Sequence, residues 1–426
     1  MQKAEQLVSE AEHQLAQGSL LSAFSLLRQA LKLAPDNAYA ASRLADLLLQ
    51  QGQWEEGETL LRDATAHSPR FAPAHLLLAR IALHRGQTDA ALASLDEAIR
   101  HDNAAWGARI EKAQLLETLG RMREASLCWS EAVRSMPPHL RESPQMEGLV
   151  GHARTIATRN LSELRDHLMT KVEPVMQGQS RMETERFAHA LDIVTGRREF
   201  VTAQPLFLPI PRLPAIPFFH PESFGWAPRI QEATDEIAAE LEHLLDAAAG
   251  EFTPYVQTRR GNSSGQFADL DRNPDWSAFF LLKHGQRIDS HCAICPVTDA
   301  VVAEAPLPRI RARAPAVMFS KLEAGAHIPA HNGATNARLT VHLPLIVPPG
   351  CAFQVGDEVR EWKRGELMIF DDTIRHEAWN QSDRPRTILI FDIWHPMLSD
   401  LERELVTRTV EGLVEYYDDA NELHSL

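Results

Sequence analysis

The chain has 426 residues, enough for two or three domains, and 44% of them are hydrophobic, as in globular proteins. Its 43 Lys and Arg residues are outnumbered by 58 Asp and Glu residues, which gives a net charge of −15. This balance argues against nucleic acid and anionic membranes as general partners.

Cysteine content and hydropathy indicate in which cellular compartment the protein is expected. Four cysteines are too few for a disulfide scaffold, although Cys292 and Cys295 form a CxxC pair that we interpret as structural. The first residues lack the apolar core of a signal peptide, and no stretch approaches the roughly 20 apolar residues that a membrane span needs. We therefore expect a cytoplasmic protein without a membrane segment.

The first third of the chain is a repeat array with a period of 34 residues. Its markers are Gly18, Gly52, Gly86 and Gly120, with small residues at fixed offsets before and after each glycine. This spacing resembles the tetratricopeptide repeat, a helix-turn-helix unit that stacks into a solenoid with a concave groove. We expect four such repeats over residues 1–139. Delivery of a peptide by the groove and pure scaffolding are equally compatible with the pattern.

Residues 140–204 keep a helical spacing of apolar residues but lose the period, so we expect a helical cap and connector. The proline-rich apolar segment from 205 to 217 favours an extended strap, because proline blocks both helix and central strand. We expect the domain boundary near residue 200 and a second domain over residues 205–426.

The second domain begins with a predicted helix over 227–249, and a turn is expected at 262–265. Strands are predicted at 275–282, 317–322, 339–345, 367–370 and 386–393, with a hairpin turn at Gly356-Asp357 and a last helix over 396–417. In the strand 339–345, leucine and valine alternate with a polar face of Arg338, Thr340 and His342, which we expect to line a ligand cavity. Short antiparallel strands in paired sheets predict a jelly roll.

Two histidines and an arginine lie among these strands. Neutral imidazoles such as His331 and His376 can hold a divalent metal such as Fe(II). The guanidinium of Arg386, at the start of an apolar strand, can clamp a carboxylate bidentately. A metal beside a carboxylate clamp is typical of oxygenases that use Fe(II) and 2-oxoglutarate.

The motifs around these residues resemble one family. They are His331-x-Gly333-x-Thr335-Asn336-x-Arg338-Leu339, His342-Leu343, Phe370-Asp371-Asp372-x-x-x-His376-Glu377-x-Trp379 and Asp392-x-Trp394-His395-Pro396, with weaker similarity at Asp275-Trp276 and Cys292. Together they resemble the aspartyl/asparaginyl β-hydroxylase family of double-stranded β-helix oxygenases. The fold class expected for the whole chain is therefore multidomain α + β: an all-α repeat solenoid followed by a cupin-like jelly-roll catalytic domain.

The resemblance implies a site. His331 and His376 are the implied metal ligands and catalytic residues, with glycine at 333 where many related enzymes place a carboxylate. Asp371 and Asp372 are alternative ligands, although we favour a role in orienting the loop. Arg386, with Ser320 as its hydroxyl partner and His342 as a further contact, is implied to bind the cosubstrate 2-oxoglutarate.

The implied reaction uses Fe(II), 2-oxoglutarate and O2 to hydroxylate an Asp- or Asn-type side chain of a peptide or protein, with succinate and CO2 as co-products. Arg338, and less securely Arg272, can pair with an acidic substrate. The family often has a second arginine where this chain has Thr340, and its absence weakens that pairing. The alternatives are hydroxylation of a free amino acid or other small molecule, a halogenase-like activity, and a non-catalytic repeat scaffold.

Overall fold

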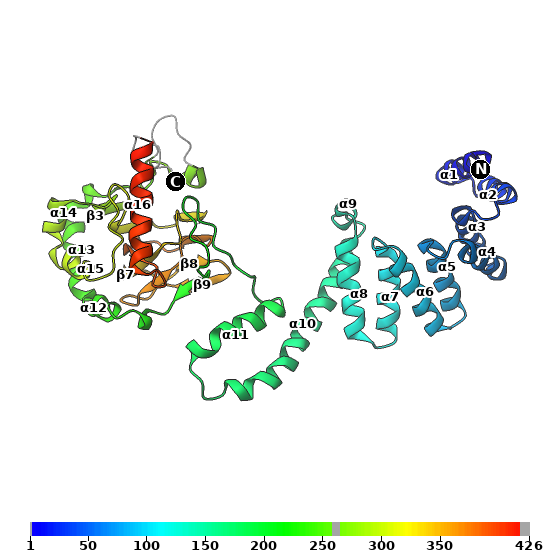
Figure 1. Ribbon diagram of the computed structural model, residues 1–426, viewed down its shortest axis with the longest axis horizontal. Coiled ribbons are helices and arrows are strands. Elements are labelled where there is room, and N and C mark those ends of the chain that lie inside the picture. Colours follow the sequence, from blue (N-terminus) through cyan, green and yellow to red (C-terminus); the bar gives the residue numbers. More distant parts are fainter. Residues whose placement is uncertain (1, 258–264, 418–426) are drawn as a thin grey trace. The chain divides into compact units, whose positions relative to one another are not determined.

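The computed structural model describes residues 2–257 and 265–417. Contacts divide the chain into two compact units, Met1–Arg197 and Arg198–Leu426. The first is built from helices and the second contains the sheets (Figure 1). No helix in the described ranges combines the length and the apolar character that crossing a membrane requires.

The repeat array consists of helices that pack in consecutive pairs. These are α1 (Gln2–Ala16), α2 (Leu20–Leu33), α3 (Ala38–Gln50), α4 (Trp54–His67), α5 (Ala72–His84), α6 (Thr88–His101), α7 (Trp106–Thr118) and α8 (Met122–Ser135). The marker glycines follow the first helix of each pair with φ between +71° and +77°, a conformation that ends a helix. The alanines at 11, 45, 79 and 113 are fully buried, so small side chains let the helices approach. The predicted solenoid of helix pairs is confirmed.

Three further helices complete the first unit: α9 (Pro138–Arg141), α10 (Glu147–Met176) and α11 (Arg181–Val194). The long α10 packs on α8 and buries Val150 and Ala153, so it covers the end of the array. A capping box between Ser180 and Glu183 starts α11.

The second unit contains two antiparallel sheets. The larger has the order β1-β10-β7-β12-β5-β3-β2, with β4 beside β3, and the smaller has the order β6-β11-β8-β9. The strands are β1 (Phe218–Phe219), β2 (Thr253–Pro254), β3 (Trp276–Lys283), β4 (Gln286–Arg287), β5 (Val317–Leu322), β6 (His327–His331), β7 (Arg338–Ile346), β8 (Cys351–Val355), β9 (Glu358–Glu361), β10 (Met368–Phe370), β11 (His376–Asn380) and β12 (Arg386–Trp394). From β5 to β12 the chain crosses between the two sheets at every connection except the β8–β9 hairpin, which lies within the smaller sheet, as in a jelly roll.

The larger sheet has two different faces, as the alternation of β7 predicts. Leu339, Val341 and Leu343 belong to a core shared with the helices α12 (Ala227–Glu232), α13 (Thr234–Ala248), α14 (Asp289–Ile294) and α15 (Pro296–Val302). Thr340 and His342 alternate with them and are also buried, so they face the other side of the sheet, where the sites predicted from the sequence gather.

Some predicted boundaries differ from the structure. The helix predicted over 227–249 is two helices, and Thr234, whose hydroxyl donates to the carbonyl O of Gln231 at 2.6 Å, begins the second. The last helix, α16 (Asp400–Tyr416), begins after a capping box formed by Ser399 and Glu402, rather than at Pro396. The turn predicted at 262–265 lies, except for Gly265, outside the described residues.

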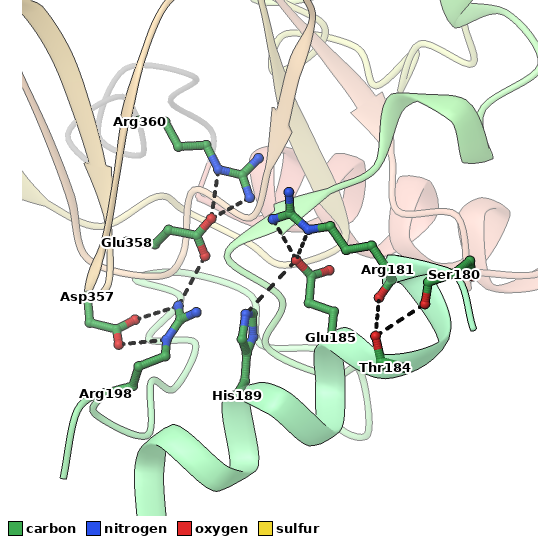
Figure 2. A network of polar contacts seen from close by, with 9 residues as sticks. All are labelled: Ser180, Arg181, Thr184, Glu185, His189, Arg198, Asp357, Glu358 and Arg360. Carbon is green, nitrogen blue, oxygen red and sulfur yellow. Dashed lines mark hydrogen bonds and ion pairs between the residues drawn. The ribbon is translucent and has the colours of Figure 1, made fainter. Parts of the chain in front are cut away.

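An ion-pair anchor precedes the extended strap that the prolines predict at 205–217. Arg198 contacts both carboxyl oxygens of Asp357 at 3.0 Å and Glu358 at 3.0 Å, and Arg360 also contacts Glu358 (Figure 2). The strap is thereby fixed to the turn between β8 and β9, the hairpin predicted at Gly356-Asp357. The separate contacts of Arg181 and His189 with Glu185 in that view lie within α11.

Cys292 and Cys295 are buried free thiols in the core of the second unit. Burial raises the pKa of Cys292 to about 11 and that of Cys295 to about 12, so both stay protonated at neutral pH. Thiols in this state are poor nucleophiles and poor metal ligands. These features agree with a structural role.

Candidate active site

Two histidines lie opposite each other in the smaller sheet. His331 ends β6, His376 begins β11, and their Cα atoms are partners in the antiparallel register. Their ring centroids are 4.0 Å apart. Nδ1 of His331 lies 2.7 Å from the carbonyl O of Pro329, and Nδ1 of His376 lies 2.9 Å from that of Ile374. Because a carbonyl can only accept, Nδ1 carries the proton in both rings, and each Nε2 keeps its lone pair for a metal.

Both imidazoles are neutral at physiological pH. Burial lowers the pKa of His331 to about 4, and burial together with the nearby His331 ring lowers the pKa of His376 to about 3. Within residues 2–257 and 265–417, no group of three or more His, Cys, Asp or Glu side chains is placed to hold a metal. The two neutral rings can therefore offer a divalent ion two nitrogen ligands.

The space beside Gly333 is filled by the side chain of Asp372. A Cβ atom at position 333 would lie 2.2 Å from Cγ of Asp372 and 2.3 and 2.4 Å from its two carboxyl oxygens. The Gly333 N–H also donates to the carbonyl O of Asp372 at 2.6 Å, so the two backbones are held together. Burial raises the pKa of Asp372 to about 7, although Arg338 opposes the shift. A side chain at position 333 would therefore have to displace this carboxyl group.

The other aspartate of the pair orients the loop. The carboxyl group of Asp371 accepts from the backbone N–H of Thr373 at 2.9 Å and from its hydroxyl at 2.5 Å. These bonds fix the turn that leads into His376.

Arg386 is a buried cation at the start of β12. It is 1% exposed, and among the described residues its Nε and Nη1 have no hydrogen-bond partner. Burial lowers the pKa of Arg386 to about 10, so the group is still charged at neutral pH. Leaving a buried charge without a partner is costly, so this guanidinium fits a site that receives an anion.

Ser320 and His342 lie on the strands that flank β12. Ser320 is the Cα partner of Ile388 in β12, and its Oγ accepts from Nε1–H of Trp276 at 3.1 Å. The serine proton is therefore available to an acceptor. His342 is the Cα partner of Ile390. Its Nδ1 is buried and has no partner within the described part of the chain, and burial lowers its pKa well below the usual value.

Arg338 is already paired within the protein. Its Nη1 lies 2.9 Å from Oδ2 of Asp392, and its Nη2 lies 4.0 Å from Oδ2 of Asp372. Two carboxyl groups thus surround one guanidinium, which reduces its attraction for an acidic substrate. Arg272, the other predicted substrate residue, lies in the turn after the short helix η3 (Gly265–Leu270), and its N–H donates to the carbonyl O of Val256.

Several aromatic side chains beside the histidines were not predicted from the sequence as site residues. Phe267 of η3 lies 4.7 Å from the His331 ring, and Trp276 lies 6.4 Å from it. Tyr255 stacks on Trp276 at 4.1 Å. Phe353 lies 5.9 Å from His376. Apart from the motif residue Trp276, no local pattern marks them, because strands and loops distant in sequence bring them together.

The strap braces both loops that carry the histidines. Every backbone N–H between residues 204 and 210 donates to one of those loops, and only Pro205 and Pro209 lack an N–H. The acceptors are the carbonyl O of Thr373 for Gln204, that of Gly333 for Leu206, that of Ala334 for Phe207 and Leu208, and Oδ1 of Asn336 for Ile210. The loops at 333–336 and 371–373 are therefore held by one extended segment. Proline restricts that segment before it binds, which reduces the entropy lost on ordering it.

Comparisons with known proteins agree with this architecture. The family model described as aspartyl/asparaginyl beta-hydroxylase matches residues 231–396, and tetratricopeptide-repeat models match residues 14–81 and 76–128. Over 200 residues, the chain is 34% identical to an ornithine lipid ester-linked acyl 2-hydroxylase of Rhizobium tropici, covering 46% of this chain and 67% of that protein.

A human protein is a further relative. The match to human aspartyl/asparaginyl beta-hydroxylase is 30% identical over 179 residues and covers 42% of this chain but only 23% of that protein. The jelly roll, the histidine pair and these matches define an oxygenase of the hydroxylase kind joined to tetratricopeptide repeats. The chain belongs to the aspartyl/asparaginyl β-hydroxylase family.

Proposed function

We propose that this protein is an Fe(II)- and 2-oxoglutarate-dependent hydroxylase. His331 and His376 would hold the iron, and Arg386, Ser320 and His342 would bind the cosubstrate. When bound, the iron and 2-oxoglutarate supply the oxidising chemistry that uses O2, releases succinate and CO2, and converts a C–H bond of the substrate into an alcohol. The protein supplies the metal ligands, orients the cosubstrate and provides a cavity that excludes water.

The roles of the protein groups follow from their contacts. The bonds from Nδ1–H of both histidines to backbone carbonyls orient the rings and make Nε2 the ligating atom. The hydroxyl of Ser320, oriented by Trp276, donates to the carboxylate that Arg386 binds. Phe267 beside His331 and Phe353 beside His376 exclude water from the rings.

The observation that carries the proposal is the combination of two neutral imidazoles, whose Nδ1 atoms bond to backbone carbonyls, with a buried guanidinium whose Nε and Nη1 have no hydrogen-bond partner among the described residues. We would test it by measuring succinate formed from 2-oxoglutarate with and without Fe(II). Formation that requires iron and falls sharply in Arg386→Ala supports the proposal. Wild-type protein that forms no succinate in the presence of iron, O2 and candidate substrates would refute it.

An Asp- or Asn-type side chain of a peptide is the first candidate substrate. The family model and the human relative carry this reaction in their names, and tetratricopeptide repeats offer a groove of the kind that holds peptides. The test is mass spectrometry of a host-proteome digest after incubation with enzyme, iron and 2-oxoglutarate. A gain of one oxygen on Asp or Asn within defined peptides is the expected result.

An acyl chain is the second candidate, favoured by the surroundings of Arg338. Because Asp392 and Asp372 already flank that guanidinium, and Thr340 stands beside it, Arg338 is not free to pair with a substrate carboxylate. Phe267 and Trp276 add apolar walls near His331. The rhizobial relative is named for acyl hydroxylation. Incubation of a host lipid extract, followed by mass spectrometry for a hydroxylated acyl chain, separates this candidate from the peptide.

A halogenase-like reaction is disfavoured by Asp372. Its carboxyl group occupies the space beside Gly333, where a halide would take the place of the missing carboxylate. The same mass spectra, recorded with chloride present, should contain hydroxylated and no chlorinated product.

A further inference from the structure

A fourth polar side chain, that of Trp362, lies beside the cosubstrate residues. Trp362 follows β9 and is 4% exposed, and its Nε1–H makes no hydrogen bond within the described residues. An unsatisfied buried donor is costly and rare, so each one in a native structure requires an explanation.

The position of Trp362 supplies that explanation. Cζ of Arg386 lies over the indole ring, 4.5 Å from its centroid, and the His342 ring lies 6.0 Å away. The three side chains therefore cluster, and each has at least one buried nitrogen without a partner: Nε and Nη1 of Arg386, Nδ1 of His342 and Nε1 of Trp362. Three neighbouring side chains that each leave a nitrogen unpaired, one of them positively charged, suit a single anionic ligand better than separate defects do.

The indole also determines where the guanidinium points. A cation over an aromatic face is attracted by the ring without using its N–H groups as hydrogen-bond donors. Phe353 stacks on Trp362 with ring centroids 5.5 Å apart and an interplanar angle of 21°, so the indole ring is itself fixed. Arg386 is thereby oriented while its Nε and Nη1 stay free for a ligand.

We infer that Trp362 is a cosubstrate-binding residue: its indole N–H donates to the carboxylate that Arg386 binds, and its ring orients Arg386. This inference rests on the proposed use of 2-oxoglutarate. It predicts that the residue acts on the carboxylate remote from the keto group, and that it has no direct effect on the metal.

The test compares two ligands and two variants by isothermal titration of the full-length protein loaded with Mn(II) under nitrogen. The ligands are 2-oxoglutarate and 2-oxobutanoate, which lacks the remote carboxylate. Trp362→Phe keeps an aromatic face and most of the volume but removes the N–H. Trp226→Phe, in the same unit but outside this cluster, is the matched control.

In Trp362→Phe we expect binding of 2-oxoglutarate to weaken roughly tenfold or more, as when a hydrogen bond to a charged group is lost. Binding of 2-oxobutanoate and of Mn(II) should stay within about twofold of wild type, which also shows that the variant is folded. Trp362→Tyr, which restores a donor on an aromatic ring, should recover part of the loss and provides a second variant if the phenylalanine form is unstable.

The outcomes distinguish failure of the proposed 2-oxoglutarate dependence from failure of the role of Trp362. Wild-type protein that binds Mn(II) but not 2-oxoglutarate would refute the proposed function itself. Wild-type binding of 2-oxoglutarate with no loss in Trp362→Phe, or an equal loss for both ligands, would overturn the role of Trp362 alone.

Discussion

Gly333→Ala tests the close approach of the two loops that carry the metal histidines. The added Cβ would lie 2.2 Å from Cγ of Asp372, far inside van der Waals contact. The loops cannot easily separate, because Gly333 N–H donates to the Asp372 carbonyl O and the strap holds both segments. We expect the variant to lose about 1–3 kcal/mol of the free energy of unfolding, the usual cost of overpacking.

A double-mutant cycle isolates the contact. Asp372→Ala removes the carboxyl group that the new methyl would meet, so Gly333→Ala should cost far less in that background, with a coupling of about 1–3 kcal/mol. Gly225→Ala is the control: a Cβ at Gly225 meets nothing within 4 Å, and its cost should stay within about 0.5 kcal/mol.

Urea unfolding of the metal-free protein, followed by tryptophan fluorescence, measures all four forms of the cycle. Because the chain has two units, the transition assigned to the second unit is the one to compare. If Gly333→Ala is as stable as wild type, or if its cost is unchanged in the Asp372→Ala background, the steric reasoning fails.

Three further predictions concern the cosubstrate, pH and the repeats. Arg386→Ala should raise the 2-oxoglutarate concentration needed for half-maximal turnover at least tenfold and leave the iron requirement within about twofold, and equal changes in both would contradict a carboxylate clamp. Affinity for Mn(II), measured by titration in Asp372→Ala so that this carboxyl group with a pKa of about 7 does not contribute, should stay nearly constant from pH 8 down to about 5.5. Burial holds the histidine pKa values near 4 and 3, so protons compete only below that range. A loss centred at the ordinary histidine pKa of about 6.5 would show that the rings are exposed. Removal of residues 1–197 should leave succinate formation without a prime substrate intact but weaken hydroxylation of a protein substrate, and unchanged turnover of that protein would rule out delivery by the repeats.

Local patterns in the sequence predicted much of this architecture. The 34-residue period of glycine and alanine defines the helix pairs, and alternation in the strand containing His342 separates a core face from a site face. The bounds of the strand at 317–322 agree with β5. Helix ends were harder to place, because the capping box at Ser399, rather than Pro396, starts α16.

Motifs marked most of the predicted site residues, and Arg386 was predicted from its place at the start of an apolar strand. The motifs contain His331, His376 and Arg338, but the pairing of Arg338 with Asp392 depends on two strands, β7 and β12, that meet in the sheet. Similarly, the clustering of Trp362 with Arg386 joins segments 24 residues apart that no local period connects. Contacts of this kind depend on strand order and register, which one sequence does not define.

The central claim is that His331 and His376 hold an iron ion next to a bound keto-diacid. Its most direct test is the rate of succinate formation from 2-oxoglutarate, measured with saturating Fe(II) and O2 in wild type, His331→Ala and His376→Ala, with exposed His67→Ala as the control. We predict iron-dependent succinate formation in wild type and in the control, and loss of both iron binding and succinate formation in the two site variants. Full iron affinity and undiminished succinate formation in either site variant would contradict the account.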